Sequence, residues 1–121
     1  MAKVMVVDDE SALLELVSEF LSQDLGHEVY MHKSAESAMK ALTDNGDLLP
    51  DLLITDYKMH GMTGAELIEK VHTQMKSVKN VLLTGYLEKE IQEALVPFST
   101  ICIRKPVSLD SLEELIDEVL E

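Results

Sequence analysis

The chain has 121 residues, of which 46% are hydrophobic and 27% are charged, which is ordinary for one globular domain with a single core. Its formal net charge of −13 argues against nucleic acid or an anionic membrane as a direct partner. A lone cysteine, Cys102, excludes an internal disulfide and fits a reducing compartment. Because the sequence shows neither a signal peptide nor an apolar stretch of membrane-spanning length, we expect a single cytoplasmic domain over residues 1–121.

Short apolar runs alternate five times with longer segments of helical periodicity. The runs that predict strands are Val4–Val7, Val29–Met31, Leu52–Ile54, Val81–Leu83 and Ile101–Ile103. The apolar faces that predict helices are formed, in chain order, by Leu13, Leu16, Val17, Phe20 and Leu21; by Ala35, Ala38 and Leu42; by Leu67, Ile68, Val71 and Met75; by Leu87, Ile91 and Leu95; and by Leu109, Leu112, Leu115, Ile116 and Val119.

Signals for helix ends support this division. Ser34 and Ser108 are N-cap candidates, and the segment Thr63–Glu66, "TGAE", has the pattern of a capping box. Gly26 stands where the first helix should end, and Asp44–Asp47, "DNGD", predicts a turn.

Five strand–helix units with short buried strands predict an α/β fold, a doubly wound (βα)5 parallel five-stranded sheet covered by helices on both faces. Right-handed crossovers leave few topologies, and the flavodoxin-like strand order 2-1-3-4-5 is the commonest at this length. In such sheets ligands bind at the carboxyl ends of the strands, beside the switch point between strands 1 and 3. The residues that end each strand are therefore the candidates for function.

Polar residues end four of the five predicted strands. Asp8 and Asp9 follow the first, Asp56 follows the third, Thr84 follows the fourth and Lys105 follows the fifth. Each alone has an ordinary structural explanation, as a helix cap, a backbone partner or a solvated charge. On four neighbouring strands together, three carboxylates, a hydroxyl and an ammonium group indicate one shallow functional pocket.

The chemistry of this set suits a phosphoryl group and Mg²⁺. Asp9 and Asp56 can bind the ion directly, with Asp8 holding a metal-bound water, since Mg²⁺ takes one or two carboxylates and keeps several waters. A carboxylate can also be the nucleophile that accepts a phosphoryl group. Mg²⁺, the Lys105 ammonium and the Thr84 hydroxyl would then each contact one phosphoryl oxygen.

The motifs "VVDDE", "ITDYKMHGMTG", "LLTG" and "RKP", in this order and spacing, resemble the receiver domain of two-component response regulators over essentially the whole chain. The resemblance implies that Asp56 is the phosphoacceptor and that Thr84 and Lys105 contact the phosphoryl group. It also implies that Asp8, Asp9, Asp56 and the backbone carbonyl of Lys58 serve Mg²⁺.

The resemblance further implies a signalling switch rather than a turnover enzyme. The phosphoryl donor would be a phosphohistidine on a sensor histidine kinase or a histidine phosphotransfer protein. A downstream protein would bind the face formed by the helix near residues 87–95, the strand Ile101–Ile103 and the helix over 109–119, with no direct nucleic-acid or membrane contact. Lys58 and Tyr86 border the approach of an attacking water, so we expect slow self-dephosphorylation. The bond between Lys105 and Pro106 is usually cis in this family.

Four positions depart from the family pattern. His60 replaces a proline, Thr63 replaces an aspartate, and Gly85 replaces an alanine after Thr84. We expect His60 to be a solvated loop residue. Cys102 stands where an aromatic switch side chain is usual, and we expect it to be an inert thiol buried in its strand.

Three other functions are compatible with parts of the pattern. A phosphatase of the haloacid-dehalogenase type also uses Mg²⁺ and an aspartyl nucleophile, but it needs a second carboxylate where this chain has Lys58. Flavodoxin-type flavin binding needs a first loop rich in hydroxyls and glycine, whereas this one is anionic. A scaffold that is never phosphorylated would not need all five key positions, which are intact here.

Overall fold

The computed structural model describes residues 1–44, 49–85 and 89–120, and its five parallel strands form one sheet in the order β2-β1-β3-β4-β5. The strands are β1 (Lys3–Val7), β2 (Glu28–His32), β3 (Leu52–Asp56), β4 (Lys79–Thr84) and β5 (Ile101–Arg104). Every run predicted as a strand is present, longer by one or two residues at one or both ends. The predicted fold class and strand order are confirmed.

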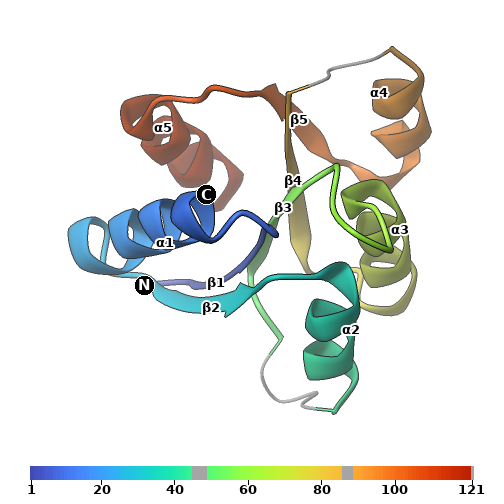
Figure 1. Ribbon diagram of the computed structural model, residues 1–121, viewed down its shortest axis with the longest axis horizontal. Coiled ribbons are helices and arrows are strands. Elements are labelled where there is room, and N and C mark those ends of the chain that lie inside the picture. Colours follow the sequence, from blue (N-terminus) through green and yellow to red (C-terminus); the bar gives the residue numbers. More distant parts are fainter. Residues whose placement is uncertain (45–48, 86–88, 121) are drawn as a thin grey trace.

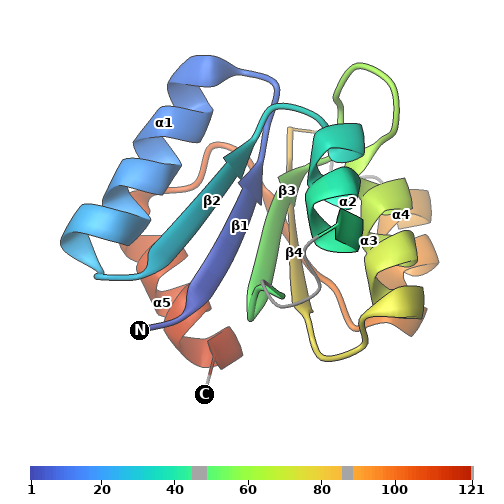
Figure 2. The ribbon, with the colours of Figure 1, turned by 90° about the horizontal axis from the view of Figure 1, so that it is seen from below.

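Helices cover both faces of the sheet (Figures 1 and 2). One face carries α1 (Ser11–Glu19), which continues as the π-helical turn η1 (Phe20–Asp24), and α5 (Leu109–Leu120). The other face carries α2 (Ala35–Asp44), α3 (Gly64–Gln74), α4 (Lys89–Leu95) and the short 3-10 helix η3 (Val96–Phe98). In Figure 2 the strands run upward, so their carboxyl ends lie along the upper edge.

The sheet separates two apolar half-cores, because successive strand residues point to opposite faces. The α1/α5 half-core consists of Val4, Val6, Leu14, Val17, Leu21, Leu52, Ile54, Val81, Leu83, Leu112 and Ile116. The α2/α3/α4 half-core consists of Met5, Val7, Ala35, Ala38, Leu42, Leu53, Met59, Leu67, Ile68, Val71, Val78, Leu82 and Leu95. The two half-cores pack the helices onto the sheet, and the sheet positions the side chains at its carboxyl edge.

The apolar face predicted for the first helix is partly wrong. Leu16 is 51% exposed, whereas Leu14 and the polar Ser18 are buried. Two helix faces with spacings of three and four residues both contain Val17 and Leu21. The structure buries the face that also contains Ser18. A serine in this face hid it from a search for apolar periodicity.

The predicted caps are confirmed where the structure describes them. The Ser34 hydroxyl accepts from the backbone N–H of Ser37 at 3.0 Å, and Ser108 accepts in the same way from Ser111 at 3.1 Å. Thr63 forms the predicted capping box at the start of α3. Gly26 has φ +74°, which suits the end of a helix. Of the turn predicted at 44–47, residues 45–47 lie outside the described residues.

Candidate functional site

Two buried carboxylates and one ammonium meet at the carboxyl edge of the sheet. Asp8 follows β1 and Asp56 ends β3, so the register of the two strands brings them side by side. Lys105 directly follows β5, and its Nζ lies 3.3 Å from Asp8 Oδ2 and 3.2 Å from Asp56 Oδ1. The structure therefore brings residues 8, 56 and 105 together, as predicted.

The surrounding backbone fixes both carboxylates. Asp56 Oδ1 accepts from the N–H of Tyr57, and Asp8 Oδ1 accepts from the N–H of Glu10, each at 2.9 Å. Burial raises the pKa of Asp56, Lys105 opposes this rise, and the neighbouring charge of Asp8 adds to it. Ionised Asp56 is thus costly in the folded chain, and a positive charge nearby would relieve that cost.

Asp9 completes a group of three carboxylates. In the described part of the chain, Asp8, Asp9 and Asp56 each offer an oxygen within 4.8 Å of the others, a group able to hold a metal ion. Such an all-oxygen donor set suits Mg²⁺. Asp9 Oδ2 also contacts Nδ1 of His60 at 3.0 Å. The His60 side chain is exposed, as predicted, but its contact with Asp9 is a feature that the sequence did not reveal.

Thr84 ends β4 in a fully buried position. Its carbonyl accepts from the N–H of Lys105 at 2.7 Å, and the carbonyl of the preceding Leu83 accepts from Tyr57 at 3.2 Å. These bonds tie the ends of β3, β4 and β5 into one unit. The contact of the Thr84 hydroxyl with a phosphoryl group stays a prediction.

The start of α3 packs directly against the backbone of the candidate acceptor. A Cβ at Gly64 would collide with the carbonyl of Asp56, so this position requires glycine. The N–H of Gly64 donates to Tyr57 at 2.9 Å. Lys58, in the same loop, is exposed, and the role of its carbonyl as a metal ligand stays a prediction. Tyr86, predicted to shield the site, lies outside the described residues.

Cys102 is half-buried in β5, opposite Leu82, and packs against the α2/α3/α4 half-core. Burial raises the pKa of its thiol, a shift that disfavours the reactive thiolate. The side chain is less buried than predicted, and the inertness of the thiol stays a prediction. The peptide bond between Lys105 and Pro106 is cis, as the resemblance implied.

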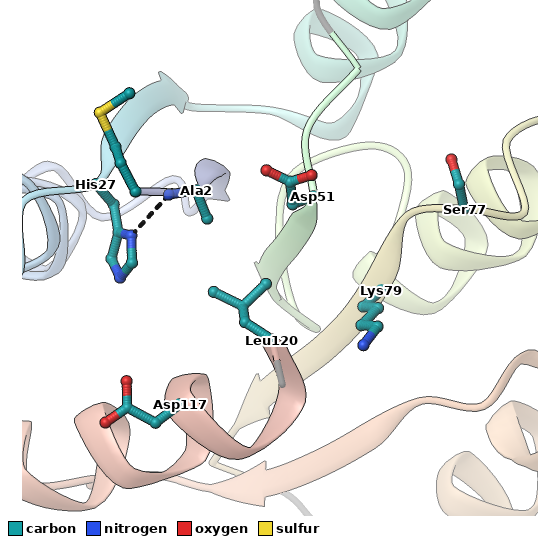
Figure 3. A pocket seen from close by; sticks show the side chains of 8 residues that line it. Ala2, His27, Asp51, Ser77, Lys79, Asp117 and Leu120 are labelled. Carbon is teal, nitrogen blue, oxygen red and sulfur yellow. Dashed lines mark hydrogen bonds between the residues drawn. The ribbon is translucent and has the colours of Figure 1, made fainter.

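An open cavity of about 520 Å³ lies at the opposite edge of the sheet, where the strands begin (Figure 3). Its lining residues are Met1, Ala2, His27, Asp51, Ser77, Lys79, Asp117 and Leu120. Ligands of doubly wound sheets bind at the carboxyl ends of strands, so its size does not make it the candidate site. The candidate site is the group of charges at the other edge.

The model of the response regulator receiver domain family matches residues 4–117. The chain belongs to this family. This receiver domain is 33% identical to a chemotaxis protein CheY homolog of Campylobacter jejuni, over 98% of this chain and 92% of that protein. Other curated relatives are longer, and the domain spans 54% and 33% of two of them. Receiver domains of response regulators interact with kinases and with effector domains.

Solved receiver domains share the whole fold. The CheY-like receiver domain protein of Methanospirillum hungatei superposes with a TM-score of 0.91 at 28% identity, covering 99% of this chain and 94% of that one. The response regulator TrrA of Thermotoga maritima, solved in complex with Mg²⁺–BeF, gives 0.86 at 29% identity, covering 99% and 100%. None of the helices described for this receiver domain has the length and apolar character needed to cross a bilayer.

Proposed function

We propose that this receiver domain is the phosphoacceptor switch of a two-component system, with Asp56 taking a phosphoryl group from a phosphohistidine. The donor would be a sensor histidine kinase or a histidine phosphotransfer protein in the cytoplasm. The observation that supports this most strongly is the position of the Asp56 carboxylate. It lies 3.2 Å from the Lys105 ammonium and within 4.8 Å of oxygens of Asp8 and Asp9, at the sheet edge where ligands bind.

The proposed reaction is a transfer from nitrogen to oxygen. A carboxylate oxygen of Asp56 attacks phosphorus and forms the new P–O bond, while the P–N bond to the donor imidazole breaks. The imidazole nitrogen leaves with the bonding electron pair and takes up a proton from water. The products are an acyl phosphate on Asp56 and an unmodified histidine, so no oxidant or reductant is needed.

The residues around Asp56 have separate parts in this step. Contacts from Lys105 and from the N–H of Tyr57 both fall on Oδ1, which fixes the carboxylate and leaves Oδ2 for the attack. The ammonium of Lys105 would contact one phosphoryl oxygen, and the hydroxyl of Thr84 would donate to another. Because the acceptor is held before the donor arrives, its orientation costs little at the moment of reaction.

Mg²⁺ fits the charges of this site. Three carboxylates and one ammonium leave two negative charges uncompensated, which one divalent ion would balance. Asp8, Asp9 and Asp56 would hold it, with the carbonyl of Lys58 as a further candidate. When bound, the ion supplies positive charge that stabilises the transferring phosphoryl group.

We further propose that the product is a signal rather than a turnover intermediate. The exposed Lys58 follows the acceptor by two residues and is neither a carboxylate nor an amide that could orient an attacking water. In-line attack demands accurate placement, and an error of about 1 Å can cost on the order of a hundredfold in rate. Slow loss of the phosphoryl group would result.

The partner surface is proposed on α4, β5 and α5. Exposed carboxylates on this surface include Glu90, Glu93, Asp110, Glu114, Asp117 and Glu118. Val96, in η3 directly after α4, is 70% exposed, and Ile101 of β5 is 36% exposed, so both add apolar area. A partner with a basic rim around an apolar contact would complement this surface. Chemical-shift mapping with the cognate partner tests this, and a footprint confined to α2 and β2 would contradict it.

Incubation with acetyl phosphate and Mg²⁺, followed by mass measurement of the intact protein, tests the function. We expect one phosphoryl group that is lost slowly and that is absent when Mg²⁺ is chelated. Steady release of phosphate without a lasting adduct would instead indicate a phosphatase. Neither adduct nor release would indicate a scaffold.

A further inference from the structure

His60 makes two contacts with one oxygen of Asp9. Its Nδ1 lies 3.0 Å from Asp9 Oδ2, and its backbone N–H donates to the same oxygen at 3.3 Å. The two residues are 51 positions apart in the chain, so this pair joins the loop after β1 to the loop after β3. With the imidazole proton on Nδ1, the ring Nδ1 and the backbone nitrogen of His60 both donate, and the carboxylate accepts.

Asp9 depends on this pair more than its neighbours do. Asp8 and Asp56 are each held by a backbone N–H and by Lys105. In the described part of the chain, both contacts of the Asp9 carboxylate come from His60. Its side chain is also the most accessible of the three, at 24% exposed against 7% and 10%. Without His60, Asp9 would be free to rotate into solvent.

The loop that carries His60 is itself fixed. The N–H of Met62 donates to Glu36 Oε2 on α2 at 2.8 Å, and the N–H of Gly64 donates to the carbonyl of Tyr57 at 2.9 Å. His60 lies in the chain between Tyr57 and Met62, whose backbone groups take part in these two bonds. It therefore offers its donors from a held backbone, although the imidazole itself is exposed.

We propose that His60 is a positioning residue of the metal site, which orients Asp9 through two hydrogen bonds to Oδ2 and leaves Oδ1 to a divalent cation. This inference rests on the proposed function, in which Asp9 holds Mg²⁺. Hydrogen bonds to a ligating carboxylate raise metal affinity because the ligand is already oriented when the ion arrives. A proline at this position, as in the family pattern, could supply neither donor.

Mg²⁺ titrations followed by backbone amide spectra test the proposal, without any phosphoryl donor. His60→Ala keeps the backbone donor and should weaken Mg²⁺ binding by about tenfold, near the low end for ligand-orienting residues because the imidazole is exposed. His60→Pro removes both donors and should weaken binding further. His60→Asn, whose amide can reach Asp9 from a similar position, should restore most of the affinity.

Two controls separate orientation from a general effect. His72→Ala removes an imidazole near the far end of α3, where it packs on Phe98, and should leave Mg²⁺ affinity unchanged. In an Asp9→Asn background, His60→Ala should cost little additional affinity, because the two residues act together. Melting temperatures should not distinguish His60→Ala from wild type, since its imidazole is exposed.

The outcomes are distinct. Equal or tighter Mg²⁺ binding by His60→Ala, with normal binding by wild type, would overturn the role of His60 and leave the proposed function intact. A full tenfold loss that persists in the Asp9→Asn background would overturn it as well. Absence of Mg²⁺ binding by the wild type would overturn both proposals.

Discussion

The two edges of the sheet use polar side chains in opposite ways. At the edge where the strands begin, three polar side chains have backbone partners. Asp51 accepts from the N–H of Lys3 at 2.8 Å, and His27 accepts from that of Ala2 at 3.1 Å. Lys79 donates to the carbonyl of Val119 at 2.6 Å. These bonds satisfy backbone groups near the ends of strands and of α5, so these side chains stabilise the fold.

At the edge where the strands end, two carboxylates share one ammonium group. Lys105 contacts both Asp8 and Asp56, whereas Asp9 contacts His60. Charges that a fold leaves without a counter-charge indicate a binding site for a ligand of opposite charge. The open cavity of about 520 Å³ lies at the edge where the strands begin, so charge balance rather than volume distinguishes the candidate functional edge.

The largest contrast should come from removing one carboxylate at each edge. Asp56→Asn should abolish phosphorylation by acetyl phosphate, because an amide is a poor nucleophile for phosphorus. Asp51→Asn, the matched change at the other edge, should be phosphorylated at the wild-type rate. Intact-mass time courses measure both, and a full-rate adduct on Asp56→Asn would refute the acceptor assignment.

Replacing one lysine at each edge should lower the free energy of unfolding by different amounts. Lys105→Met leaves two buried carboxylates without their counter-charge and should cost about 2 kcal/mol at pH 7, less than a fully buried pair because Lys105 is 19% exposed. Lys79→Met removes one exposed hydrogen bond and should cost below about 1 kcal/mol. Urea unfolding measures both values.

The pH dependence of the Lys105→Met loss provides its control. The pKa of Asp56 is already raised by burial, so ionisation of Asp56 opposes folding, and stability falls as the pH rises above the ordinary carboxyl value of 3.8. Loss of the ammonium enlarges that fall. The difference between variant and wild type should therefore shrink toward about pH 4, and a constant difference would contradict this account.

A smaller effect is expected for Asp9→Ala. We expect Mg²⁺ affinity to fall by about tenfold or more, because a ligand is lost. With Mg²⁺ chelated, the melting temperature should rise slightly, because one of three crowded like charges is gone. Asp117→Ala, at the other edge, should change neither Mg²⁺ affinity nor phosphorylation. A lower melting temperature for Asp9→Ala would show that Asp9 stabilises the fold.

The smallest effect should follow loss of one bond at the amino edge. His27→Ala removes the acceptor for the N–H of Ala2 and should cost about 0.5–1.5 kcal/mol of unfolding free energy. Phosphorylation and Mg²⁺ binding should stay at wild-type levels, as radiolabel and titration assays would show. A change in either would mean that the two edges are coupled.

Much of the fold was predictable because buried parallel strands have a strong signal. Runs such as Val4–Val7 and Leu52–Ile54 are apolar on both faces, and capping residues such as Thr63 act on neighbours in sequence. The inner face of α1 was less predictable, since the choice between Leu14 and Leu16 depends on packing against the sheet and α5. Local periodicity contains little information about that choice.

The residues of the candidate site also differ in how far the sequence predicts their positions. Strand order alone brings Asp8, Asp56 and Lys105 together, because each ends or follows a strand whose place in the sheet could be predicted. The partner of Asp9 could not be predicted, because His60 lies in a loop whose path depends on tertiary contacts such as the hydrogen bond from Met62 to Glu36. A departure from the family pattern at His60 was the one signal available.

The separation of the apolar interior by the sheet has a consequence for mutational energetics. Leu42 belongs to one half-core and Ile116 to the other, and both are almost fully buried. Truncating either to alanine should cost about 2–5 kcal/mol. Since neither vacancy can be filled from across the sheet, the two losses should sum with little coupling energy. The domain can thus vary one side of its interior while the other stays unchanged.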